Sequence, residues 1–132
     1  MRTGNYLIAN LISRINFGII RRLRFIKVNI NDTTLNILNI LYKHGVIRAF
    51  IIKDGKVLIY YKYSYSRPAA KFSIISSPGN KISWSLKKLS YKYNNNNFSG
   101  FYIISTQKGI YTSHHCLLND HIAGNVLIKV EI

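Results

Sequence analysis

The chain has 132 residues, of which 48% are apolar, so its length fits one compact unit or two very small ones. Its 19 lysines and arginines against 4 acidic residues give a formal net charge of +15. Self-repulsion of that size disfavours a compact free protein, so we expect a polyanionic partner: nucleic acid first and an anionic membrane surface second, with mere solubility as the plain alternative. The single cysteine, Cys116, excludes an internal disulfide, and no apolar run approaches the roughly 20 residues of a membrane span.

Apolar residues near the start of the chain recur with the spacing of one helix face. They are Leu7, Ile8, Leu11, Ile12 and Ile15. Thr3 is the expected N-cap and Gly18 the expected stop, while Arg14 and Asn16 fall off the apolar stripe. Residues 25–30 alternate partly and predict a strand.

A second helix is expected after this strand, with Asp32, Thr33 and Thr34 as possible N-caps and Gly45 at its end. Its inward-facing residues should be Leu35, Leu38, Leu41 and Tyr42. Two strands follow, at 46–53 and 56–63, and Asp54-Gly55 between them is a strong hairpin signal. The N-terminal order is therefore α-β-α-β-β.

The segment SYSRPAA, residues 64–70, indicates a boundary between an N-terminal module at 1–65 and a C-terminal module at 66–132. The second module should contain strands at 71–75, 82–85, 101–106 and 125–132, a turn at 77–80 and a short helix or turn at 85–89. Asn94 to Asn97 predicts an exposed loop. We predict an α+β fold whose C-terminal module is mainly antiparallel β with short helices.

The apolar run from Phe101 to Ile104 ends in the polar turn Ser105-Thr106-Gln107-Lys108-Gly109. The turn places two hydroxyls, an amide, a cation and a glycine at the end of a strand. Such groups suit hydrogen bonding to sugar and phosphate oxygens, and they cannot assemble a hydrolytic site by themselves. The plain alternative is an ordinary strand-end turn.

This block resembles the C-terminal signature of the small-subunit ribosomal protein S8 family. The matching residues are Ser105, Thr106, Lys108, Gly109, Ile110, Thr112 and Gly124. Gln107 stands where the family usually has a second serine, and its amide can donate and accept in place of that hydroxyl. Residues 7–18 (LIANLISRINFG) resemble the family's first helix, and Ser77-Pro78-Gly79 followed by Lys81 resembles a further family segment, with Ser77 in place of the usual arginine.

The three motifs occur in family order and at nearly family spacing, and together they cover almost the whole chain. The resemblance implies a structural rRNA-binding protein of the small ribosomal subunit, with neighbouring ribosomal proteins as partners and without a cofactor, a membrane or a small-molecule substrate. In the family, the turn meets an irregular part of an rRNA helix, because side chains cannot read the deep, narrow groove of A-form RNA. The segment at Ser77, Gly79 and Lys81 is implied to face RNA as well.

Cations in the first half of the chain are further candidates for phosphate contacts. Arg21, Arg22 and Arg24 form a local positive patch, although for any single residue a solvated surface is the plain alternative. The complete set of expected RNA-binding residues is Arg14, Asn16, Arg21, Arg22, Arg24, Lys27, Ser77, Gly79, Lys81, Ser105, Thr106, Gln107, Lys108, Gly109 and Gly124.

Tyrosines 60, 61, 63 and 65 alternate with Lys62 and Arg67, a pattern that can stack bases. We favour a strand with one face in the core and the other on RNA backbone or a neighbouring protein.

We expect neither a metal site nor an enzyme. His114, His115 and Cys116 are adjacent, so they do not point at one ion, and no second ligand pair follows at zinc-site spacing. The sequence gives no geometry that would join Asp120, a histidine and Ser105 in a catalytic triad. A basic nuclease would need magnesium ligands, and carboxylates are scarce here.

Isoleucine, asparagine, lysine and tyrosine, whose codons are AT-rich, are abundant. Because this bias is common in organelle genomes, we hypothesise a protein of the mitochondrial matrix, with a plastid or a bacterial cytoplasm as alternatives. The arginine-rich, acid-free start also resembles a mitochondrial transit peptide, but the same residues match the family's first helix. A free-standing organellar RNA-binding or RNA-processing factor is the competing function.

Overall fold

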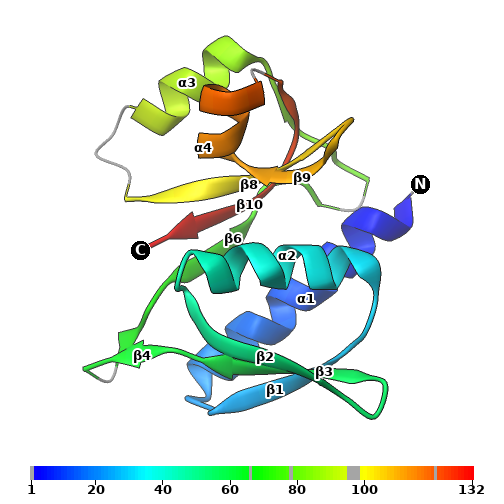
Figure 1. Ribbon diagram of the computed structural model, residues 1–132, viewed down its shortest axis with the longest axis vertical. Helices are drawn as coiled ribbons and strands as arrows, with labels where there is room; N and C mark the ends of the chain where they lie inside the picture. The colour runs from blue at the N-terminus through cyan, green and yellow to red at the C-terminus, as the bar shows by residue number, and fades with distance from the viewer. Residues whose placement is uncertain (1, 66, 78, 95–98, 121) are drawn as a thin grey trace.

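The computed structural model describes residues 2–65, 67–77, 79–94, 99–120 and 122–132, and it has the predicted α+β fold (Figure 1). The N-terminal part contains α1 (Arg2–Ile20), β1 (Phe25–Asn29), α2 (Asp32–Lys43), β2 (Ile47–Lys53) and β3 (Lys56–Tyr61). These three strands form an antiparallel sheet in the order β1-β3-β2. The predicted α-β-α-β-β order is confirmed, including the hairpin through Asp54 and Gly55.

The C-terminal part is built on a second antiparallel sheet, in which β6-β10-β8-β9 are neighbours and β7 also pairs with β10. Its elements are β6 (Lys71–Ile74), β7 (Ser83–Trp84), α3 (Leu86–Asn94), β8 (Gly100–Thr106), β9 (Gly109–Thr112), α4 (Ser113–His115), the π-helical turn η1 (Cys116–Asp120) and β10 (Gly124–Glu131). A small hairpin of β4 (Tyr63–Ser64) and β5 (Arg67–Pro68) connects the two parts. Most of the predicted loop at Asn94 to Asn97 lies outside the described residues.

Helix α1 starts before Thr3 and continues past Gly18, so the predicted cap and the predicted stop are both wrong. Gly18 lies where the side chain of Tyr61 crosses the helix, and a Cβ on Gly18 would lie 2.0 Å from Tyr61 Oη. That hydroxyl donates a hydrogen bond to Ile15 O at 2.8 Å. The glycine therefore allows a close approach between helix and sheet and does not end the helix.

Helix α2 is capped by Asn31, whose Oδ1 accepts from Thr34 N at 2.8 Å, and not by the three predicted residues Asp32, Thr33 and Thr34. The prediction for Gly45 is confirmed: with φ +72°, it lets Val46 N donate to Leu41 O and closes the helix with a Schellman motif. Tyr42 was expected inside but is 52% exposed. One residue after the buried Leu41, it is rotated about 100° around the helix and packs edge-on against Phe50.

Helices α1 and α2 form a middle layer between the two sheets (Figure 1). One buried cluster joins Ile12 and Ile15 of α1 to Ile59 of the N-terminal sheet and to Phe101 and Ile103 of the C-terminal sheet. The sheets separate near the expected boundary, whereas the core is continuous across it. The division into modules at 1–65 and 66–132 therefore stays a prediction.

The C-terminal sheet is buried on both faces. In β8, Phe101 and Ile103 face the helix layer, whereas Tyr102 and Ile104 join a second cluster with Leu89 of α3. Burial on both faces explains the unbroken apolar run of this strand. Strand β10 confirms the strand predicted for residues 125–132, and its register shifts between Val126 and Ile128, so it contains a bulge.

Among the described residues, none of the helices has both the length and the apolar character needed to cross a bilayer.

Replacing Gly18 with alanine should destabilise the fold. Alanine in a helix normally gains about 1 kcal/mol over glycine, whereas the clash with Tyr61 should cost about 1–3 kcal/mol. We expect a net fall in the free energy of unfolding, measured by urea denaturation. Ser13→Ala at an exposed position of α1 is the control and should change stability little. A more stable Gly18→Ala protein would contradict the close-approach role.

Alkaline unfolding should report the buried phenol of Tyr61. Burial raises the pKa of Tyr61 well above its usual value of 10.0, with a smaller contribution from Tyr63. The unfolded chain releases this proton near pH 10 while the folded chain keeps it. The free energy of unfolding should therefore fall above pH 10 by up to about 1.4 kcal/mol per pH unit. Urea unfolding of the wild type and of Tyr61→Phe should be measured between about pH 9 and about pH 11. The free energy of unfolding should fall less steeply with pH in the variant. Equal slopes in the two proteins would contradict this role of the Tyr61 phenol.

Candidate nucleic-acid interface

The five residues predicted for the turn between β8 and β9 have two different roles: some hold the turn closed and others face outward. Thr106 Oγ1 donates to Gly109 O at 2.9 Å and accepts from Lys108 N at 3.2 Å, so its hydroxyl closes the turn. Gly109 has φ +137°, a conformation that favours glycine. Gln107 and Lys108 form the exposed connection, and Ser105 is half-buried at the end of β8. The exposed functional groups of the turn are therefore the amide of Gln107 and the ammonium group of Lys108.

Gly124 lies against the base of this turn. Asn125 pairs with Ser105 across the β10–β8 ladder, and a Cβ on Gly124 would lie 2.1 Å from Ser105 O. Any side chain at this position would displace the backbone of the turn. Gly124 thus shapes the site through its small size.

The segment at 77–82 is fixed beside the same sheet end. Ser76 is only 1% exposed; its Oγ donates to Val126 O at 2.6 Å and accepts from Ile82 N at 2.9 Å. Ser77 and Asn80 form the predicted turn through two reciprocal backbone hydrogen bonds, with Gly79 at φ +80°. Pro78 lies outside the described residues.

Strand β7 continues from this segment and pairs with the start of β10, where Asn125 faces Ser83 on one side and Ser105 on the other. The structure therefore brings the turn, the 77–82 segment and Gly124 together at one end of the C-terminal sheet (Figure 1). We call this surface the turn face, defined by Ser77, Gly79, Lys81, Gln107, Lys108 and Gly124.

Side chains behind the turn support it. Tyr111 Oη donates to Lys108 O at 3.4 Å, and the Tyr111 ring stacks on His115 with 4.4 Å between ring centroids. Cys116 is buried in the second core cluster. In the part of the chain that the structure describes, no three potential metal-ligating residues gather.

Two predicted residues on α1 differ in their surroundings. Arg14 is exposed, whereas Asn16 is half-buried and its Nδ2 donates to Phe72 O of β6 at 3.2 Å. Asn16 therefore links the helix to the C-terminal sheet. Lys27 is exposed on β1, in the sheet on the other side of the helix layer.

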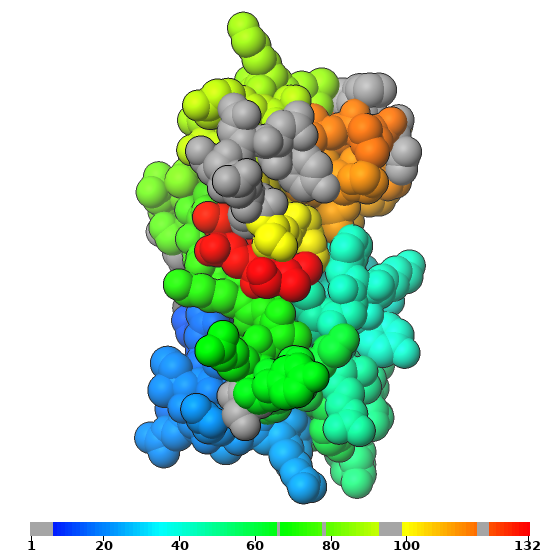
Figure 2. All heavy atoms as spheres, turned by 90° about the vertical axis from the view of Figure 1, so that its left-hand side faces the viewer, coloured from blue at the N-terminus to red at the C-terminus, as the bar shows by residue number. Residues whose placement is uncertain are grey.

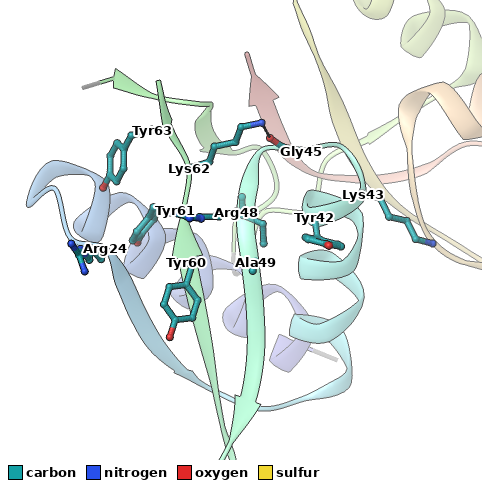
Figure 3. A pocket seen from close by; sticks show the side chains of 11 residues that line it. Arg24, Tyr42, Lys43, Gly45, Arg48, Ala49, Tyr60, Tyr61, Lys62 and Tyr63 are labelled. Carbon is teal, nitrogen blue, oxygen red and sulfur yellow. Dashed lines mark hydrogen bonds between the residues drawn. The ribbon is translucent and has the colours of Figure 1, made fainter. Parts of the chain in front are cut away.

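The connection between α1 and β1, whose sequence includes Arg21, Arg22 and Arg24, lies at the opposite end of the molecule from the turn face (Figure 1). Arg21 lies over the Phe17 ring at 5.0 Å, and Arg22 has φ +55° in the connection to β1. Arg24 lines an open groove together with several tyrosines (Figure 3). The predicted residues thus form two surfaces, one in each part of the chain.

The tyrosine pattern also divides in the structure. Tyr61 belongs to the core, Tyr60 and Tyr63 line the groove half-buried, and Tyr65 is 99% exposed. Lys43 and Arg48 line the same groove and were not among the predicted site residues. Their signal in the sequence is weak: both are cations that flank Gly45 at the end of α2.

Comparisons with known proteins agree with these observations. Residues 7–130 match the family model described as ribosomal protein S8. Small ribosomal subunit protein uS8m of Acanthamoeba castellanii is 38% identical over 127 residues, which cover 95% of this chain and 98% of that protein. Small ribosomal subunit protein uS8 of Orientia tsutsugamushi (strain Boryong) is 34% identical over 131 residues, with 93% and 95% covered. The uS8 protein of Rickettsia canadensis is 28% identical over 129 residues, with the same coverage.

Ser76→Ala should loosen the 77–82 segment and destabilise the fold. The change removes the acceptor of Ile82 N and the donor to Val126 O, and such a buried loss costs about 1–3 kcal/mol. Urea unfolding should show this cost, and the amide of Ile82 should exchange its hydrogen faster. Ser64→Ala, at an exposed serine, is the control and should do neither. Unchanged exchange at Ile82 would contradict the role of Ser76.

Proposed function

This chain belongs to the ribosomal protein S8 family, whose members are constituents of the small ribosomal subunit, and we propose that it binds small-subunit rRNA in a mitochondrial ribosome. The membership confirms the resemblance that the three sequence motifs carried. The family is one of structural ribosomal proteins, so the proposed mechanism is binding without chemistry.

The observation that carries the rRNA proposal is the turn face. Two segments about thirty residues apart, at Ser77 to Lys81 and at Ser105 to Gly109, meet beside Gly124 on a sheet that is buried on both faces. A firm backbone with short polar groups at its end suits recognition of RNA shape, because register is fixed by contacts to phosphate and sugar. Gln107 is suited to hydrogen bonds with 2′-hydroxyls or exposed base edges, and Lys108 and Lys81 to phosphates.

The net charge of +15 supplies the rest of the proposed affinity. Each phosphate that a lysine or arginine neutralises releases counterions, so binding should weaken as salt rises. The turn face would fix the position on an irregular rRNA element, while cations elsewhere on the surface would contact the surrounding backbone. Neighbouring small-subunit proteins are the further proposed partners.

Two findings support a mitochondrial location. One relative is named uS8m, and the codons of the abundant residues are AT-rich. The similar uS8 proteins of Orientia and Rickettsia are bacterial, so a bacterial cytoplasm or a plastid remains the alternative. The competing function is a free-standing organellar RNA-binding or RNA-processing factor.

Sedimentation of lysates on sucrose gradients tests the proposal. The wild-type protein should migrate with the small subunit in the mitochondrial fraction and remain there after a moderate salt wash. Lys108→Glu should reduce this occupancy severalfold, by about the effect of one lost phosphate contact and one new repulsion. The matched control is Lys53→Glu at the end of β2, which should co-sediment as the wild type does. Migration as a light free species would contradict the ribosomal function and would favour the free-standing RNA-binding or RNA-processing factor.

A further inference from the structure

An open groove of about 1230 Å³ lies in the N-terminal part of the molecule, away from the turn face. The residues that line it include Tyr42, Tyr60 and Tyr63 and the cations Arg24, Lys43 and Arg48 (Figure 3). We call it the tyrosine groove. Figure 2 looks onto this side, where residues near 60 (green) lie between the blue α1–β1 connection and the cyan α2.

The groove is built by the backbone around the start of β2. The Schellman turn at Gly45 brings the end of α2 next to β2, which places Tyr42 and Lys43 at one wall. The β2–β3 ladder shifts register between Ile47 and Ala49, so Arg48 is the extra residue of a bulge. Such bulges redirect a side chain, here a guanidinium beside the groove (Figure 3).

Some of the lining groups are already engaged within the protein. Lys62 Nζ donates to Gly45 O at 3.1 Å and so meets the negative end of α2. Tyr63 Oη donates to Leu23 O at 2.8 Å, which fixes its ring in place. Tyr42 is 52% exposed, and Arg24, Lys43 and Arg48 are exposed cations with no carboxylate partner among the described residues.

None of the described residues that line this groove is acidic, and two of the acidic residues lie far from it. Asp32 begins α2, whose last residue Lys43 lines the groove, and a helix of 12 residues is about 18 Å long. Asp54 lies in the β2–β3 turn, at the opposite end of both strands from Arg48 and Tyr60. The charged side chains that line the groove are therefore all cations, namely Arg24, Lys43, Arg48 and Lys62, and such a lining attracts a polyanion.

We propose that the tyrosine groove binds an unpaired segment of RNA, with bases stacked on its tyrosines and phosphates held by Arg24, Lys43 and Arg48. This inference rests on the proposed function and adds a second contact, remote from the turn face. Aromatic rings interleaved with cations along an open groove are the chemistry of single-strand binding, since the rings need unstacked bases. The groove is open and its volume exceeds the roughly 300–1,000 Å³ of small-molecule sites, which fits a chain-like ligand.

Fluorescence anisotropy with labelled oligouridine of about twelve nucleotides tests this on the full-length protein. Lys43→Glu combined with Arg48→Glu should weaken binding about tenfold or more. The slope of the logarithm of the binding constant against the logarithm of the salt concentration should become shallower by roughly 1.4, or 0.7 for each lost phosphate contact. Lys53→Glu combined with Lys56→Glu, at the far end of the same hairpin, is the matched control and should bind within about twofold of the wild type.

The turn-face variant Lys108→Glu separates this proposal from the proposed function. It should lower occupancy on the small subunit but leave oligouridine affinity within about twofold of the wild type. Equal oligouridine binding by the groove variant and the control would overturn the inference while leaving rRNA binding at the turn face intact. If the groove variant instead loses only an acidic peptide probe such as oligoglutamate, the groove is a protein site and the inference fails.

Stacking has its own test. Tyr60→Leu should weaken oligouridine binding about fivefold or more, whereas Tyr91→Leu, at an exposed tyrosine of α3, should not. Should the groove variants fail to fold, photo-crosslinking of 4-thiouridine strands to the wild-type protein decides the matter. Crosslinks within residues 42–48 or 60–63 support the groove, and crosslinks confined to other peptides overturn it.

Discussion

The packing of α1 and α2 between two sheets is the constraint on which the rest of the structure depends. Both sheets bury a face against the same helices, so neither sheet has a complete core without them. Asn16 reinforces this layer by a hydrogen bond to Phe72 of β6, and Tyr61 does so by its bond to Ile15. Because the helix layer is shared, it fixes how the turn face and the tyrosine groove are placed relative to each other.

Much of this fold follows from local spacing. The hairpin at Asp54-Gly55, the αL position of Gly45 and the apolar stripe of α1 were predictable, because each depends on residues close in sequence. The errors at Gly18 and Tyr42 have a different origin. Gly18 responds to Tyr61, more than forty residues later, and Tyr42 packs against Phe50 of the neighbouring strand. Such long-range contacts leave no periodic trace in the sequence.

The two candidate sites differ in the same way. The turn face was predictable in its residues because a family pattern links them, although the pattern did not show that Thr106 and Gly124 build the turn and that Gln107 and Lys108 face outward. The tyrosine groove has no such pattern. Arg48 and Tyr60 lie near each other only because β2 and β3 pair, and the bulge at Arg48 is a property of that pairing.

The double burial of the C-terminal sheet has a consequence for the thermodynamics of assembly. A turn whose hydroxyl bonds are already made, on strands packed from both sides, has little conformational entropy left to lose when a ligand arrives. Under the proposed function, the conformational entropy lost on binding would then come almost entirely from the nucleic acid. The protein would act as a rigid template, and the flexible rRNA element would adopt the shape that the template presents.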